Sequence, residues 1–193
     1  MTTSPFPLLD LKSELLSTLQ SQFLQTCQRL SLPPSPHHLL VHIPSQELYH
    51  FINNTLTKSY SISTSDNPPS CQENSFGTPW GMHKIAEKHG DNAPIGTVFK
   101  ARISTNQTYL VSPFNSSNDR LVTTRILWLA GLELGLNQGP NIDSFERFIY
   151  IHGTNREHLI GTPATLGCIT LTNKDIITLF NSTPCDSLVY IQK

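Results

Sequence analysis

The spacing of the apolar residues changes at 33-PPSPHH-38, and this change limits which folds the chain can adopt. Prolines end a helix because proline lacks the backbone N–H that a helix needs and disfavours helical geometry in the residue before it. Upstream, apolar residues recur every three or four positions, as on one face of a helix. They are Leu8, Leu11, Leu15, Leu19, Phe23, Cys27 and Leu30. We therefore predict a helical appendage and linker over residues 1–36.

Downstream of the prolines, the chain consists mainly of short β-prone runs separated by turns. The first three runs, LLVHI, ELYHFI and SYSIST, are typical of an antiparallel meander. Further strands are predicted over 83–87, 96–103, 108–112, 122–131, 147–153 and 186–192. Residues 173–182 instead predict a short helix, with Asn173 or Thr172 as its N-cap. Residues 37–193 should thus form one mostly β domain with short helices, built around a single core.

The segment 65-SDNPPSCQENSFGTPWG-81 interrupts these runs and predicts a surface loop, because it is rich in proline, serine, asparagine and glycine. Loops of this length in a compact domain are often functional. Its tryptophan, Trp80, is a candidate to contact a substrate, with packing in the core as the alternative. For Trp128, in a predicted strand, we favour packing in the core.

Charge and hydropathy exclude several classes of function. The net charge is −1 and the basic residues are spread along the chain, so no basic face for nucleic acid is expected. The longest strongly apolar run, 126–132, is much shorter than the roughly 20 residues that a membrane span needs. Asp10, Lys12 and Glu14 break up the N-terminus, which therefore does not resemble an export signal. We expect a cytoplasmic protein, or one of the periplasm or cell envelope if the N-terminus is incomplete.

The cysteines and histidines do not predict a metal site. The cysteines lie far apart, without a C-x-x-C pair, which argues against a zinc ribbon and a redox pair. They are Cys27, Cys71, Cys168 and Cys185. Without an export signal we expect free thiols instead of two disulfides. His83 and His89 lack a third ligand at metal spacing, so we expect them to be exposed, and no metal or cofactor is expected.

A histidine and a cysteine sixteen residues apart have the surroundings of a catalytic pair. His152 ends the run RFIYI and precedes Gly153, so it can face a cleft. Cys168 follows Gly167 and lies shortly before the predicted helix. A tight turn near a helix start would point backbone N–H groups at the sulfur, which lowers the pKa of the thiol and supplies an oxyanion hole. The alternative is that Cys168 is a small core residue and His152 a hydrogen-bonded residue at a strand end.

These residues resemble the catalytic motif of the L,D-transpeptidase catalytic-domain family. In that motif a histidine in an H-G-T context precedes a [Ser/Thr]-x-Gly-Cys-Ile-Arg turn. The matching residues are His152, Gly153, Thr154, Gly161, Pro163, Ala164, Thr165, Gly167, Cys168 and Ile169. Segments 78–102 and 123–155 also look like parts of this family, so the resemblance covers roughly residues 39–193.

The resemblance implies a mixed-β domain with a cleft that acts on the tetrapeptide stem of peptidoglycan. The bond attacked would join the L-centre of the third residue, usually diaminopimelate, to the terminal D-Ala. Cys168 would be the nucleophile, and His152 would take its proton and later protonate the leaving amine. Thr165 would orient His152, and the N–H groups around Gly167 and Cys168 would hold the oxyanion. Substrate contacts are expected from Gly153, Thr154, Trp80, Arg125 and Arg156.

Two positions depart from the family pattern. Leu166 stands where the family usually carries His, Lys or Arg, and Thr170 stands where it usually carries Arg. A guanidinium can pair bidentately with a substrate carboxylate, and a threonine hydroxyl cannot replace its charge. The candidate replacements are Arg125, Arg147 and Arg156, each with an ordinary surface ion pair as the alternative.

The group that attacks the thioester on Cys168 determines which reaction the protein would catalyse. A cytoplasmic enzyme would meet soluble muropeptides, so we expect hydrolysis, which makes the protein an L,D-carboxypeptidase. The alternative is a transpeptidase that forms 3–3 cross-links between stems. A second alternative is a non-catalytic protein that binds peptidoglycan peptides, because Leu166 and Thr170 remove charge from the pocket.

Overall fold

The computed structural model describes residues 7–33, 35–109 and 119–193. The chain divides into two compact units, Met1–Pro34 and Ser35–Lys193. The first unit holds helix α1 (Pro7–Arg29), which confirms the helix that the apolar spacing predicts. Among the described residues, no helix is both long enough and apolar enough to cross a membrane.

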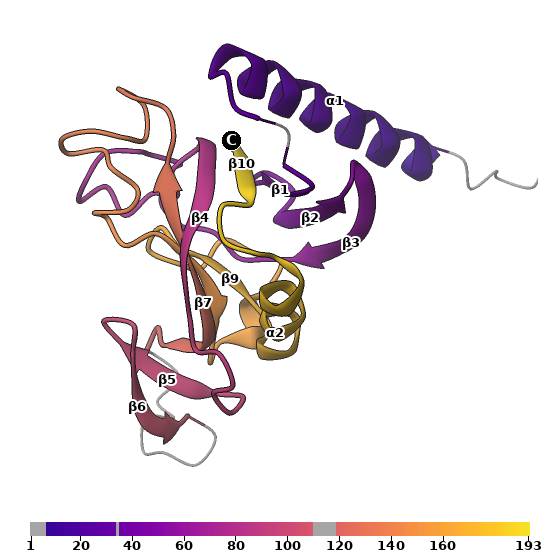
Figure 1. The fold of residues 1–193 in the computed structure, drawn as a ribbon. Coiled ribbons are helices and arrows are strands. Elements are labelled where there is room, and N and C mark those ends of the chain that lie inside the picture. Colours follow the sequence, from indigo (N-terminus) through magenta and orange to yellow (C-terminus); the bar gives the residue numbers. More distant parts are fainter. Residues whose placement is uncertain (1–6, 34, 110–118) are drawn as a thin grey trace, which may run out of the picture. The chain divides into compact units, whose positions relative to one another are not determined.

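The second unit is built on one mixed sheet of ten strands (Figure 1). The strands are β1 (His37–His42), β2 (Glu47–Ile52), β3 (Thr55–Ser61), β4 (Gly81–His89), β5 (Thr97–Lys100), β6 (Ile103–Thr108), β7 (Val122–Gly131), β8 (Tyr150–Gly153), β9 (Ile169–Leu171) and β10 (Leu188–Gln192). Their order is β3-β2-β1-β10-β4-β7-β5-β6, and β8 pairs with both β7 and β9. Strands β1, β2 and β3 form the predicted meander, and β10 joins it parallel to β1. The mostly β fold class is therefore confirmed.

Several predicted strands differ from those observed; the run SYSIST, at 59–64, overlaps only the end of β3. The run 96–103 is a hairpin and not one strand, because Ala101 and Arg102 adopt φ of 46° and 68° and turn β5 back into β6. Positive φ at both central residues is typical of the tight turn that joins two strands of a hairpin. Such turns usually carry Asn or Gly, so the residues Ala101 and Arg102 do not predict a turn. The predicted strand 108–112 shares only Thr108 with β6, and residues 110–112 lie outside the described residues.

The last strand before the site is also shorter than predicted. Strand β8 begins at Tyr150, because Phe148 has a φ of 56° and its N–H donates to the carbonyl of Phe145 in a turn. Only the second half of the predicted strand 147–153 is therefore extended.

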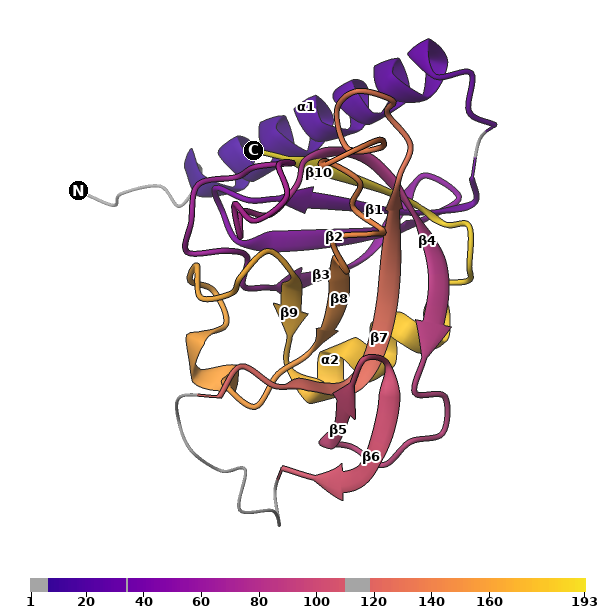
Figure 2. The same ribbon diagram turned by 90° about the vertical axis from the view of Figure 1, so that its left-hand side faces the viewer.

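Helix α2 (Asn173–Ser182) covers the sheet beside the strands that carry the site (Figure 2). Its N-cap is Thr172, whose side-chain oxygen accepts a hydrogen bond from the N–H of Asp175 at 3.1 Å. The helix contacts β7 and β8 and buries Ile176, Leu179 and Phe180 in the main core. Burial of each such side chain stabilises a fold by about 1.5–3 kcal/mol. This packing fixes the segment that follows β9.

The prediction that His83 is exposed is wrong. The residue lies on β4 in the interior of the sheet, between β10 and β7, and is fully buried. Its Nε2 lies 2.9 Å from the hydroxyl of Ser144, and its Nδ1 lies 3.1 Å from the carbonyl oxygen of Gly81. Burial lowers the pKa of His83 to about 4, so the ring is a neutral structural group. Trp128 is buried as predicted and stacks on Phe145 with ring centroids 3.8 Å apart.

Candidate active site

The parallel pairing of β8 and β9 brings His152 and Cys168 to the same pocket. His152 lies opposite Thr170 in the register of these two strands. Residues two positions apart on a strand share a face, so Cys168, which immediately precedes β9, lies on the face of Thr170. The N–H of Tyr150 donates to the sulfur of Cys168 at 3.4 Å, which ties the turn before β9 to the start of β8.

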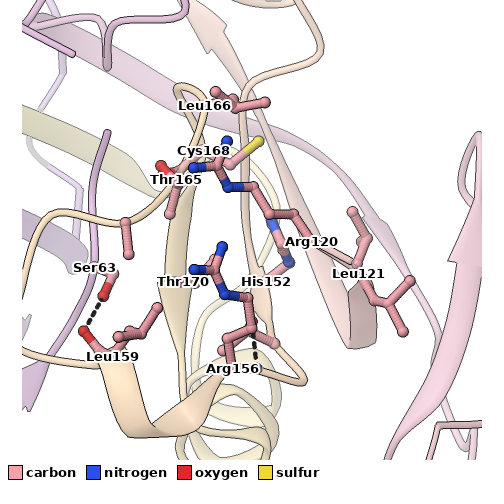
Figure 3. A pocket seen from close by; sticks show the side chains of 13 residues that line it. Ser63, Arg120, Leu121, His152, Arg156, Leu159, Thr165, Leu166, Cys168 and Thr170 are labelled. Carbon is pink, nitrogen blue, oxygen red and sulfur yellow. Dashed lines mark hydrogen bonds between the residues drawn. The ribbon is translucent and has the colours of Figure 1, made fainter. Parts of the chain in front are cut away.

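The pocket is a cavity of about 160 Å³ (Figure 3). It is lined by Ser63, Arg120, Leu121, Val122, His152, Thr154, Arg156, Leu159, Ala164, Thr165, Leu166, Cys168 and Thr170. Its walls are largely apolar, and none of these lining residues carries a carboxylate. Two guanidinium groups point into it, so the cavity favours an anionic ligand with apolar parts.

The imidazole of His152 is oriented by the next residue in the chain. Its Nδ1 donates to the carbonyl oxygen of Gly153 at 2.7 Å, which fixes the tautomer and leaves Nε2 as an acceptor. Burial lowers the pKa of His152 to about 4, so the ring is neutral near pH 7. A Cβ on Gly153 would lie 2.6 Å from Asn173 Oδ1 and 2.8 Å from the Thr123 carbonyl oxygen. Only glycine fits there, and Gly153 positions His152 instead of lining the pocket.

Thr165 stabilises the cysteine turn and does not orient His152, contrary to the prediction. Its hydroxyl donates to the carbonyl of Cys168 at 2.6 Å and accepts the N–H of Gly167 at 3.3 Å. Gly167 has a φ of 116°, a conformation that L side chains rarely adopt. Because the N–H of Gly167 already has a partner, the N–H of Cys168 is the remaining member of the predicted oxyanion pair.

The expected lowering of the Cys168 pKa is wrong. Helix α2 starts only after β9 and Thr172, so its N-terminus does not adjoin the sulfur. The side chain is partly exposed at the pocket wall, but the protein surrounds it elsewhere, and burial raises the pKa of the thiol to about 11. The N–H of Tyr150 and the charge of Arg147 act in the opposite direction. The resting site therefore holds a neutral thiol and a neutral imidazole.

Arg147, a candidate substrate anchor, is instead engaged with the loop before β4. Its guanidinium donates to the carbonyls of Ser70 at 3.0 Å and Gly77 at 2.8 Å. It does not line the pocket. It holds the loop of residues 65–81 in place and contributes a positive charge near Cys168.

Arg125 and Trp80 lie outside the pocket. The register of β7 shifts between Thr123 and Ile126, where Thr124 has a φ of 69°. Such a bulge redirects side chains, and the guanidinium of Arg125 donates to the carbonyls of Ala93 and Thr124. Trp80 packs against the main core. The structure therefore brings Thr154 and Arg156, but not these two residues, to the pocket.

Arg120 lines the pocket and was missed by the sequence reasoning. Its guanidinium donates to the carboxylate of Asp66 at 2.9 Å, across 54 positions of the chain. The residue lies just before β7 in a polar stretch that carries no motif. No pattern in the sequence connects it with the cysteine turn, and only the fold brings the two together.

The mixed β domain, with His152 and Cys168 on one pocket, agrees with the fold class and the paired residues that the sequence predicts. Comparison with known proteins identifies the family. Residues 36–191 match the family model YkuD, the L,D-transpeptidase catalytic domain. The chain belongs to this family. Among proteins with curated functions, none matches the sequence.

Solved structures share the fold at low sequence identity. An L,D-transpeptidase from Mycobacterium smegmatis is 12% identical with a TM-score of 0.51, over 82% of this chain and 59% of that one. L,D-transpeptidase 3 from Mycobacterium tuberculosis, in complex with a faropenem-derived adduct, is 11% identical with a TM-score of 0.52, over 82% and 60%. An L,D-transpeptidase from Xylanimonas cellulosilytica is 12% identical with a TM-score of 0.51, over 83% and 62%. The chain thus spans about three fifths of each of these proteins.

Proposed function

We propose that the protein is a cysteine acyl-transfer enzyme that acts on peptidoglycan tetrapeptide stems. The bond broken joins the L-centre of the third residue, diaminopimelate, to the terminal D-Ala. The observation that carries the proposal is that Cys168 and His152 line one pocket while Gly153 holds the imidazole with Nε2 unprotonated. Family membership supports the substrate class.

In the first step, the sulfur of Cys168 attacks the carbonyl carbon while Nε2 of His152 accepts the thiol proton. Both groups are neutral at rest, so the charges develop only as the new C–S bond forms. The carbonyl of Gly153 stabilises the imidazolium, and the N–H of Cys168 donates to the oxyanion. Thr165 holds the turn in which this N–H lies.

In the second step, the tetrahedral intermediate collapses and His152 returns the proton to the nitrogen of D-Ala. The C–N bond breaks, D-Ala leaves, and a thioester remains on Cys168. We propose that water resolves it, which makes the protein an L,D-carboxypeptidase that trims muropeptides in the cytoplasm. Attack by the amine of a second stem, which gives a 3–3 cross-link, is the alternative. Cell fractionation tests the location.

A second candidate function is binding of peptidoglycan peptides without catalysis. It is favoured by one observation: burial raises the pKa of Cys168 and lowers that of His152. A protonated thiol beside a weakly basic imidazole reacts slowly unless the substrate promotes proton transfer.

The experiment that separates these functions incubates the protein with disaccharide-tetrapeptide and follows the masses of products and protein. Loss of D-Ala indicates a carboxypeptidase, and a dimer of stems indicates a transpeptidase. An acyl adduct on Cys168 in the quenched protein supports the thioester. Binding without any product supports the second candidate.

A further inference from the structure

The two guanidinium groups of the pocket differ in their partners. Arg120 forms an ion pair with Asp66, and both side chains are over one third exposed. Arg156 has no ion-pair partner among the described residues, and its Nε is buried without a hydrogen-bond partner there. The side chain of Arg156 nevertheless points into the cavity (Figure 3).

An unpartnered guanidinium nitrogen in a buried place is destabilising, because it has lost water and gained no acceptor. A ligand carboxylate in the cavity would supply a countercharge to this guanidinium and an acceptor for its terminal N–H groups, which point into the cavity. Among the described residues that line the pocket, none carries a carboxylate that could do so. The cavity therefore contains a cationic side chain that can pair with an anionic group of a ligand.

The position of Arg156 indicates which carboxylate it meets. Arg156 follows β8 by three residues, on the side of the pocket where His152 lies opposite Thr170. His152 protonates the leaving nitrogen in the proposed mechanism, so the leaving residue lies over this side. The terminal carboxylate of that residue is separated from its nitrogen by one carbon, within reach of a neighbouring arginine.

We infer that Arg156 binds the terminal carboxylate of the leaving D-Ala and supplies the positive charge that Thr170 lacks. The inference rests on the proposed function, because that function defines the leaving residue. Arg156 is thus a specificity residue, because it selects stems in which the residue after the scissile bond ends in a free carboxylate. Arg120, already paired with Asp66, contributes less.

The test compares disaccharide-tetrapeptide with the same compound ending in D-alaninamide. Wild type should show kcat/KM about 10–100-fold lower for the amide, the range expected when a charge-assisted hydrogen bond is lost. Arg156→Gln should lose as much on the free acid, mainly through KM, and little more on the amide. Arg156→Lys should recover part of the loss, because it restores charge without the planar fork. Lys84→Gln, an exposed lysine on β4 paired with Asp186, is the matched control and should change neither substrate's kinetics.

A binding measurement keeps this inference separate from the proposed reaction. Calorimetry with Cys168→Ala should give a Kd about 10–100-fold weaker for the amide than for the acid. This preference should vanish in Cys168→Ala/Arg156→Gln. If wild type shows no turnover but the preference is found, the reaction fails and the carboxylate site stands. Equal binding of acid and amide, or a preference that survives Arg156→Gln and disappears with Arg120→Gln, would overturn the inference.

Discussion

The two sides of the pocket are built differently. On the side that would carry the proposed chemistry, two contacts join near neighbours in the chain: His152 bonds to Gly153, and Thr165 bonds to Cys168. On the side that would recognise the substrate, Arg120 pairs with a residue 54 positions away. The direction of the imidazole and the shape of the cysteine turn are thus set by contacts within short segments, whereas the position of Arg120 depends on a distant part of the fold. Substitutions on the first side should affect the rate of reaction, and those on the second should affect binding.

The largest effect is expected from removal of the nucleophile. Cys168→Ala should lower the release of D-Ala from disaccharide-tetrapeptide by at least about 10⁴-fold, because loss of a nucleophile removes the covalent route. Product mass over time measures this. The matched control is Cys185→Ala, which changes an exposed free thiol and should leave the rate unchanged. Turnover retained by Cys168→Ala would show that the nucleophile is assigned wrongly.

Gly153→Ala should have the next largest effect. The new methyl group would overlap Asn173 Oδ1 and the Thr123 carbonyl, so β8 must shift and His152 must turn with it. Overpacking of this kind costs about 1–3 kcal/mol of stability, and the misplaced base should lower kcat by about 100-fold. Chemical denaturation and kinetics measure the two effects.

The control for this change is Gly135→Ala, where no atom lies within 4 Å of the added methyl group and only the positive φ opposes it. Its activity should stay near wild type. Wild-type kcat in Gly153→Ala would show that the close packing around Gly153 does not position His152.

A smaller effect is expected from Thr165→Val, which keeps the shape of the side chain and removes the hydroxyl. The turn then loses its bonds to the Cys168 carbonyl and the Gly167 N–H. We expect kcat to fall by about fivefold with little change in KM, because one net hydrogen bond is worth about 1 kcal/mol. Thr165→Ser should restore kcat. A variant whose KM rises while kcat stays constant would place Thr165 among the substrate contacts.

The difference between local and distant contacts also explains how much could be predicted from the sequence. Helix 173–182 and strand 122–131 were predicted with their observed bounds, because their periodicity and cap residues are local signals. The motif around His152 and Cys168 likewise predicted that the two residues lie at one pocket, as they do. Local spacing cannot show that a bulge turns Arg125 away or that β9 separates Cys168 from α2.

The charged wall was therefore predicted only in part. Arg156 was among the candidates because it lies within the motif region, whereas Arg120 was missed because its partner is distant in the chain. The role of Thr165 was also predicted wrongly, since the sequence does not show which way a hydroxyl points within a turn. A distant pairing decides the position of Arg120, whereas the geometry of the turn decides the role of Thr165.

The smallest expected effect is that of pH near neutrality. Burial places the pKa of His152 at about 4 and that of Cys168 at about 11. The proposed reaction needs an unprotonated imidazole and a thiol that carries its proton, and both forms prevail between these values. kcat/KM should therefore change by less than about threefold from pH 6 to 9 and fall as the pH drops towards 4, where His152 gains a proton. Rates measured across this range, with circular dichroism at each pH to confirm folding, test the expectation. A resting thiolate–imidazolium pair would instead lose activity as the imidazolium deprotonates, so a narrow maximum with half of the rate lost by pH 8 would contradict the neutral site.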